Sequence, residues 1–280
     1  MNKKWIITLS IALIIAVGIL SRSSLSAEPD VKLELNTDGF IGEYFQPKKP
    51  SNTTVVILGG GEFGAHWGRE FAKQGHSALS LPYHRQSGLP SQIEEIPLEY
   101  FEKANDWLES KNEPSRIIVM GASTNAELAL LLAAIFPSKT SGAIAICPSS
   151  VTWSNQVFPW SSDQQMAKWT YNKAPLPYLP MEKIKGGNSK LLNTLAYWNG
   201  GLNNSQKAEF AAIEVEKIKG AILLITPEDD QVWPSYRMSK MIEERMKIKG
   251  KSELLENCIY PDAGHLISAQ YVKSFTSQNG

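Results

Sequence analysis

A serine lies in a short turn between a strand-like run and a helix-like run of this chain. Residues 116–120 are rich in β-branched side chains, Gly121-Ala122-Ser123-Thr124 follows, and residues 125–136 are mostly apolar. A serine on such a tight turn projects its hydroxyl clear of the sheet and beside a helix N-terminus, whose free N–H groups stabilise negative charge. This arrangement suits attack on an acyl carbonyl. It matches the pattern G-x-S-x-G except that Asn125 replaces the last glycine.

A serine nucleophile needs a base, and the base needs a carboxylate that fixes its tautomer. Asp230 follows the apolar run 221–226, and His265 follows the next strand-like run, in an Ala-Gly-His sequence. Together with Ser123 they give the order serine, acid, histidine, each just beyond the carboxyl end of an expected strand. The sequence therefore predicts Ser123 as nucleophile, His265 as base, and Asp230 or an acidic neighbour as the acid.

Other residues compete for the roles of acid and base. The competitors are Asp229, Glu228, His66, His76 and His84. Adjacent residues at a strand end point to opposite sides, so only one of the two neighbouring aspartates can reach the histidine. Asp229 is then expected to be solvated or to cap the next helix. The three other histidines all precede the acid, although His66 follows a glycine-rich segment and is expected near the site.

Two N–H donors must face the oxyanion that forms during acyl transfer. Thr124, directly after the serine, is expected to supply one. The other is expected from the glycine-rich segment 59–64, with Gly61 and Glu62 as candidates, because glycine lets the backbone approach a substrate closely. The same segment has glycines at the three G-x-G-x-x-G positions, but no ribose-binding acid is evident about 20 residues further on. We expect no cofactor and no metal.

Strand-like and helix-like runs alternate along most of the chain, which predicts a mainly parallel α/β sheet with helices on both faces. The expected strands are 39–45 at an edge, 53–58, 77–83, 116–120, 142–147, 221–226 and 254–260, and the expected helices are 97–109, 125–136 and 235–246. The interval 151–220 breaks this alternation and is rich in Pro, Asn, Ser and Trp. We expect a cap-like insertion over the carboxyl edge of the sheet. Its aromatic residues either line an apolar acyl pocket or pack the insertion onto the body.

The N-terminal segment resembles an export signal. Two lysines precede the apolar run 6–20, and residues 21–27 are mostly small. We expect cleavage after Ala27, with an uncleaved membrane anchor as the alternative, and an exported catalytic domain over residues 28–280. Membrane association is expected only through residues 1–27. The location is then periplasmic or extracellular.

Composition limits the function classes further. The chain has 280 residues, 42% of them hydrophobic and 20% charged, which suits one large globular domain. Removing residues 1–27 leaves a net charge of −3, which does not indicate nucleic-acid binding. Cys147 and Cys258 are the only cysteines, and both lie in apolar, strand-like contexts. We expect buried free thiols, although an exported protein leaves a disulfide open.

Several segments together resemble one enzyme family. They are residues 59–64, 96–101, 121–130, 169–171, 175–180, 215–220, 228–235 and 260–267. Their combination resembles the C-terminal catalytic domain shared by acyl-CoA thioester hydrolases and bile acid-CoA:amino acid N-acyltransferase, of the α/β-hydrolase superfamily. The likeness spans roughly residues 39–268.

The resemblance implies a covalent acyl-enzyme on the elbow residue, which is serine in the thioesterases and cysteine in the acyltransferase. It therefore implies hydrolysis, with Ser123 as nucleophile, Asp230 as acid and His265 as base. The chain departs from the family at Thr124-Asn125, where Lys-Gly is usual, and at Pro227, where glycine is common.

We therefore expect a serine hydrolase that cleaves an acyl thioester or ester of a small-molecule substrate. The alternatives are an exported carboxylesterase or acyltransferase, and a non-catalytic relative that binds an acyl ligand, which Asn125 motivates. Because CoA thioesters are intracellular metabolites, an exported member is expected to act on some other acyl ester or thioester. The sequence does not indicate an oligomeric state.

Overall fold

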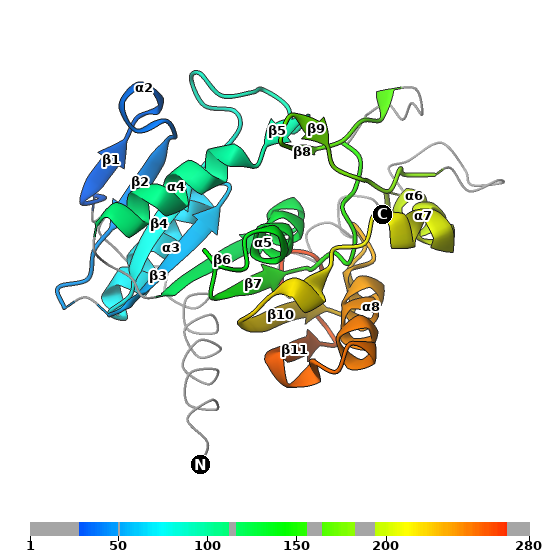
Figure 1. The fold of residues 1–280 in the computed structure, drawn as a ribbon. Coiled ribbons are helices and arrows are strands. Elements are labelled where there is room, and N and C mark those ends of the chain that lie inside the picture. The colour runs from blue at the N-terminus through cyan, green and yellow to red at the C-terminus, as the bar shows by residue number, and fades with distance from the viewer. Residues whose placement is uncertain (1–27, 50, 112–115, 156–163, 183–193, 268–280) are drawn as a thin grey trace, which may run out of the picture.

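The computed structural model describes residues 28–49, 51–111, 116–155, 164–182 and 194–267 (Figure 1). The expected signal segment 1–27 lies outside these residues. Within the described ranges, no helix is both long enough and apolar enough to span a bilayer.

In the described ranges an eight-stranded sheet forms the centre of the molecule, in the order β1-β2-β4-β3-β6-β7-β10-β11. Its strands are β1 (Val31–Leu33), β2 (Gly42–Phe45), β3 (Thr53–Leu58), β4 (Ser77–Leu81), β6 (Arg116–Ala122), β7 (Gly142–Ile146), β10 (Ala221–Pro227) and β11 (Leu255–Tyr260). From β4 to β11 all neighbours pair in parallel, whereas β1 and β2 are antiparallel. The blue β1 and the orange β11 are the two edges (Figure 1).

Helices cover both faces of this sheet. The covering helices are α3 (Gly61–Lys73), α4 (Glu99–Ser110), α5 (Thr124–Ile135) and α8 (Ser235–Ile248). The described residues also form the helices α2 (Leu35–Asp38), α6 (Thr194–Leu202) and α7 (Ser205–Phe210) and the 3₁₀ turns η2 (Val215–Lys217) and η3 (Ser252–Leu254). Strand β3 shows why both faces are apolar. Its Val56 and Leu58 pack with residues of α4 and α5, and its Val55 and Ile57 pack with residues of α3. Alternate side chains of a strand point to opposite faces, so a strand buried on both faces is continuously apolar.

The fold corrects three expectations. The edge strand is β1, which is too short for an alternation of apolar and polar residues to be recognised in the sequence. The strand expected at the edge, 39–45, is the shorter β2, which is second in the order of the sheet. Helix α3 was not expected, because its first residues are glycine-rich and glycine disfavours helix. Pro97 belongs to the short strand β5 (Ile96–Pro97), and α4 begins after it.

The insertion packs against the body through its own small core. Strands β8 (Trp169–Tyr171) and β9 (Ala174–Pro175) join β5 in a three-stranded sheet. Trp153, Trp169 and Trp198 are each at most 2% exposed. The rings of Trp153 and Trp198 meet edge-to-face, with centroids 4.7 Å apart. These three tryptophans therefore pack the insertion onto the body and do not line an open pocket. Trp160 lies outside the described residues.

Both cysteines are free thiols. Cys147 is buried directly after β7, as expected. The expectation of burial was wrong for Cys258, which is half-buried on β11. The edge position explains the difference, because among the described residues β11 pairs with β10 alone.

Candidate active site

The turn between β6 and α5 holds Ser123 in a strained backbone conformation. Ser123 has φ 58° and ψ −123°, and its N–H donates to the Ile146 carbonyl of β7 at 2.9 Å. Positive φ is costly for a residue with a side chain and marks turns that present a functional group. Gly121 makes the tight turn feasible, because a Cβ there would overlap the backbone carbonyl of Asn125. The sequence thus forms a strand, a sharp elbow and a helix in immediate succession.

The structure brings Ser123, His265 and Asp230 together. His265 Nε2 lies 3.0 Å from Ser123 Oγ, and His265 Nδ1 lies 2.8 Å from Asp230 Oδ2. Ser123 follows β6, Asp230 follows β10, and His265 follows β11. These strands are parallel, so their carboxyl ends place all three side chains at one edge of the sheet. The arrangement can move a proton from the serine hydroxyl to the imidazole.

The Asp230 carboxylate is held in a fixed orientation by three donors. The backbone N–H groups of Val232 and Trp233 donate to Oδ1 at 2.9 and 3.2 Å, and the Ser235 hydroxyl donates to Oδ2 at 2.7 Å. Asp230 itself is buried. A buried polar group needs hydrogen-bond partners in place of water, and these three donors supply them.

The loop that carries His265 is fixed by two further contacts. The ring meets the buried Trp233 edge-to-face, with centroids 6.0 Å apart. The Cys147 thiol donates to the His265 carbonyl at 2.9 Å. Burial and the nearby Asp230 charge raise the pKa of the Cys147 thiol, so it remains an S–H donor. Cys147, Asp230 and His265 place potential ligand atoms within 4.8 Å of one another, but a protonated thiol is a poor metal ligand.

The competing acids and bases lie elsewhere. Asp229 is exposed and accepts a hydrogen bond from Gln231, and Glu228 is also exposed. His76 pairs with Ser51 at 2.9 Å, and His84 packs on Tyr83. His66 lines a cavity of about 750 Å³ beside the start of α3.

The residues predicted as oxyanion donors begin two helices. Thr124 is the first residue of α5, and Gly61 and Glu62 are the first two residues of α3. The expected glycine-rich loop is therefore mostly the start of a helix, preceded by a turn at Gly59 and Gly60. Because β3 and β6 are parallel neighbours, both helices start at the same edge of the sheet. Free N–H groups at helix N-termini carry partial positive charge.

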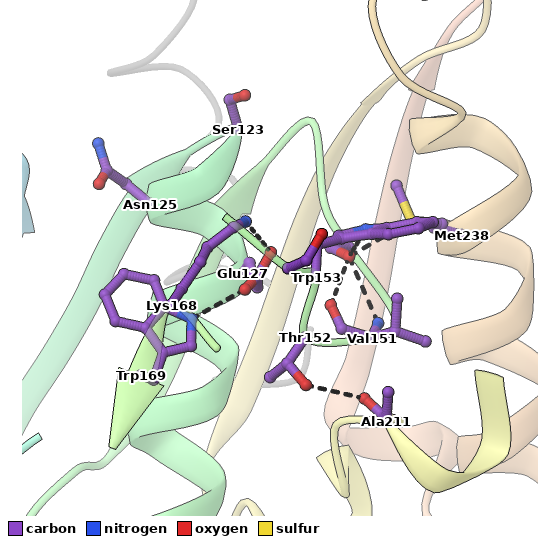
Figure 2. A network of polar contacts seen from close by, with 12 residues as sticks. Ser123, Asn125, Glu127, Val151, Thr152, Trp153, Lys168, Trp169, Ala211 and Met238 are labelled. Atoms are coloured by element: carbon purple, nitrogen blue, oxygen red, sulfur yellow. Dashed lines mark hydrogen bonds and ion pairs between the residues drawn. The ribbon is translucent and has the colours of Figure 1, made fainter. Parts of the chain in front are cut away.

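A buried ion pair that was not predicted from the sequence lies beneath the elbow (Figure 2). Glu127 of α5 is 0% exposed and Lys168 is 1% exposed, with Nζ 2.8 Å from Glu127 Oε2. Trp169 Nε1 donates to Oε1 at 2.8 Å. The insertion thus binds the first turn of α5. The signal available in the sequence was one acid within the otherwise apolar run 126–136.

The model of the family described as "BAAT / Acyl-CoA thioester hydrolase C terminal" matches residues 96–278. The chain belongs to this family. The BAAT / acyl-CoA thioester hydrolase match covers the elbow, the acid and the histidine, which are the residues that the structure brings together.

Curated members of the family are similar over most of the chain. Human acyl-coenzyme A thioesterase 6 is 27% identical over 204 residues, which are 71% of this chain and 45% of that protein. Mouse acyl-coenzyme A amino acid N-acyltransferase 2 is 29% identical over 255 residues, which are 87% of this chain and 56% of that protein. The chain therefore spans about half the length of these BAAT / acyl-CoA thioester hydrolase relatives.

Solved structures agree on the fold of this family member. Est1E from Butyrivibrio proteoclasticus has a TM-score of 0.52 at 14% identity, covering 89% of this chain and 97% of Est1E. The Francisella virulence factor BioJ has a TM-score of 0.52 at 17% identity, covering 97% of this chain and 91% of BioJ. With the mostly parallel sheet, these similarities establish the α/β-hydrolase fold.

Proposed function

We propose that this protein is a serine hydrolase that cleaves an acyl thioester or a related ester. The observation that carries the proposal is the hydrogen-bonded chain from the Ser123 hydroxyl through the His265 imidazole to the Asp230 carboxylate. A hydroxyl nucleophile requires such a base, and the base requires such an acid. Membership of a family whose description names acyl-CoA thioester hydrolase supports the same reaction class.

In the first half of the proposed reaction, Ser123 Oγ attacks the substrate carbonyl carbon while its proton passes to His265 Nε2. The carbonyl oxygen gains negative charge, which the N–H groups of Thr124 and of Gly61 or Glu62 stabilise. The intermediate then loses the leaving sulfur or oxygen, which takes the proton from His265. The acyl group remains bound to Ser123 Oγ.

In the second half, a water molecule attacks the acyl carbon and gives its proton to His265 Nε2. The bond between the acyl carbon and Ser123 Oγ breaks, and Oγ regains that proton as the carboxylic acid leaves. Throughout both halves, the Nδ1–H group of His265 donates a hydrogen bond to Asp230. The negative charge of Asp230 stabilises the protonated imidazole.

The cavity beside α3 supports a substrate with both apolar and polar parts. It has a volume of about 750 Å³ and is lined by residues that include Gly61, Phe63, Pro82 and Arg69. Because Gly61 is also a proposed oxyanion donor, this cavity is the proposed site of the acyl chain or the leaving group. We also propose, from residues 1–27, that the protein is exported and so meets esters and thioesters other than those of CoA.

Acyl transfer is the second candidate reaction. It is motivated by the similarity to the mouse N-acyltransferase, which is 29% identical over 255 residues. The two reactions share the acyl-enzyme and differ only in whether water or an amine attacks it. Product analysis with and without added glycine or taurine separates them, because only a transferase forms the amide.

The first test is covalent labelling of the nucleophile. A fluorophosphonate probe is expected to label the purified protein at Ser123, and Ser123→Ala is expected to abolish labelling. Persistent labelling of that variant would remove Ser123 from the mechanism. A protein that is inert towards both p-nitrophenyl esters and acyl thioesters, yet binds a lipid, would favour the non-catalytic relative.

A matched pair of substitutions tests the acid. Asp230→Asn is expected to lower kcat by about 10³- to 10⁴-fold, because the base loses its tautomer and its compensating charge. The control is Asp229→Asn at the adjacent exposed position, which is expected to leave kcat unchanged. Equal effects of the two substitutions would contradict the assignment.

A further inference from the structure

Asn125 replaces the last glycine of the elbow pattern. Its side chain connects the elbow to the segments that follow two other strands. We propose that Asn125 is a positioning residue that fixes the glycine turn before α3 relative to the elbow. In this role it sets the separation between the two N–H donors of the oxyanion site. The inference rests on the proposed function, because that function gives the oxyanion site its purpose.

The first observation is a hydrogen bond from Tyr83. Its hydroxyl donates to Asn125 Oδ1 at 2.5 Å. Tyr83 follows β4, is 1% exposed, and packs edge-to-face against Phe101 and Trp169. Burial and the charge of Glu127 raise the pKa of Tyr83, so its hydroxyl keeps its proton. This hydrogen bond holds the amide of Asn125 with Oδ1 towards Tyr83 and Nδ2 on the other side.

The second observation is the fit between Nδ2 and the glycine turn. A Cβ at Gly59 would overlap Asn125 Nδ2, so the amide occupies the space that a side chain at Gly59 would need. Gly59 has φ +104°, a conformation that disfavours other residues, and its N–H donates to the Leu81 carbonyl at 3.0 Å. On the other side of the turn, a Cβ at Gly60 would meet Pro82. The turn is therefore enclosed between Asn125 and the end of β4.

The consequence concerns the neighbours of these residues. Asn125 directly follows Thr124, and Gly59 lies two residues before Gly61. The contact between Asn125 and Gly59 thus connects the two proposed donors by a short path. Oxyanion stabilisation requires donors 2.7–3.1 Å from the developing charge, so a small displacement of the turn weakens it. Glycine at position 125 would leave the turn without this support.

The test is a double-substitution cycle with Tyr83→Phe and Asn125→Ala. Tyr83→Phe removes only the hydroxyl and keeps the buried ring. Each substitution is expected to lower kcat per labelled active site about tenfold, with KM within about twofold, since the support acts on transition-state charge. The double variant is expected to be no slower than Asn125→Ala alone, because Tyr83 acts through Asn125.

The controls distinguish an effect on the positions of the oxyanion donors from an effect on folding. Tyr178→Phe removes another phenol, which donates to the Gln165 carbonyl in the insertion, and is expected to leave kcat unchanged. Asn125→Gly, which has the glycine of the usual pattern, is a second variant without the amide and is expected to lower kcat as Asn125→Ala does. Unfolding by urea is measured for every variant.

Three results would overturn the inference. The first is wild-type kcat in Tyr83→Phe and in both Asn125 variants. The second is kcat losses that multiply in the double variant, which would mean that the two residues act independently. The third is lowered stability with unchanged kcat per labelled site. A wild-type protein without hydrolysis or labelling would instead overturn the proposed function, and the inference with it.

Discussion

The Ser235 hydroxyl donates to Asp230 Oδ2 at 2.7 Å, and this is the same carboxylate oxygen that faces His265. Ser235 is fully buried and is the first residue of α8. Helix α8 packs against β10 and β11, the strands that carry the acid and the histidine. One hydroxyl therefore ties the orientation of the acid to the helix that supports both strands.

Ser235→Ala is expected to lower kcat about 3- to 10-fold with KM unchanged, because the carboxylate loses one of its charge-assisted hydrogen bonds. The measurement is steady-state kinetics with an ester substrate. Ser239→Ala is the matched control, since Ser239 is buried on the same helix and donates to the Tyr236 carbonyl. Equal kcat in both variants would contradict the role of Ser235.

Lys168→Met is expected to destabilise the fold by about 3–5 kcal/mol, because it leaves the charge of Glu127 buried without its partner. Urea unfolding measures the loss. Lys207→Met is the control, because its pair with Glu182 is 52% and 37% exposed and such pairs contribute about 1 kcal/mol or less. Similar losses of stability in the two variants would show that the buried pair contributes no more to the free energy of unfolding than the exposed pair.

Glu216 links η2 to α8 through Arg245, with Nε 2.7 Å from Oε2 and Nη2 2.8 Å from Oε1. The hydrogen bonds from Arg245 hold the pKa of Glu216 below its ordinary value. A carboxyl with a lowered pKa in the folded state stabilises the fold above its unfolded pKa. That stabilisation is lost as the pH falls through the folded pKa.

Glu216→Gln is therefore expected to cost about 2 kcal/mol at neutral pH and progressively less on acidification below about pH 4. Urea unfolding from about pH 7 to about pH 3 checks this. Glu214→Gln, at an exposed pair with Lys217, is expected to show little difference at any pH. If Glu216→Gln lowered the free energy of unfolding by the same amount at every pH, the stabilisation by Glu216 would not be electrostatic.

The two thiols are expected to react at different stages of unfolding. Cys258 is half-buried on the edge strand, whereas Cys147 is 1% exposed and its thiol donates to a backbone carbonyl. Titration of the native protein with a disulfide reagent is expected to modify Cys258 slowly and Cys147 only after denaturation. Cys258→Ser should then remove the native reaction, and a remaining native thiol signal would contradict the assignment.

The sequence predicted the parts of the fold that depend on continuous apolar runs. The expected strand 53–58 has the same bounds as β3, because a strand buried on both faces is apolar at every position. The grouping of Ser123, Asp230 and His265 was predictable for a related reason. Each residue follows the carboxyl end of a parallel strand, and the carboxyl ends of parallel strands lie at the same edge of the sheet.

Features that depend on pairing distant residues were not predictable. Glu127 and Lys168 lie 41 residues apart, and no periodic pattern connects a charge in a helix with a charge in an insertion. The support of Asn125 by Tyr83, 42 residues away, is of the same kind. Helix α3 was missed for a different reason. Its local propensity is poor, and packing of Trp67 and Phe71 against the sheet stabilises it instead.

The edge position of β11 has a consequence for heat inactivation. The nucleophile follows a central strand that has neighbours on both sides, whereas the histidine follows a strand that, in the part of the chain that the structure describes, is bonded to β10 alone. Edge strands open locally at a smaller free-energy cost than central ones. On warming, turnover is therefore expected to cease several degrees before the far-ultraviolet circular dichroism changes, and to return on cooling as long as the central sheet stays intact.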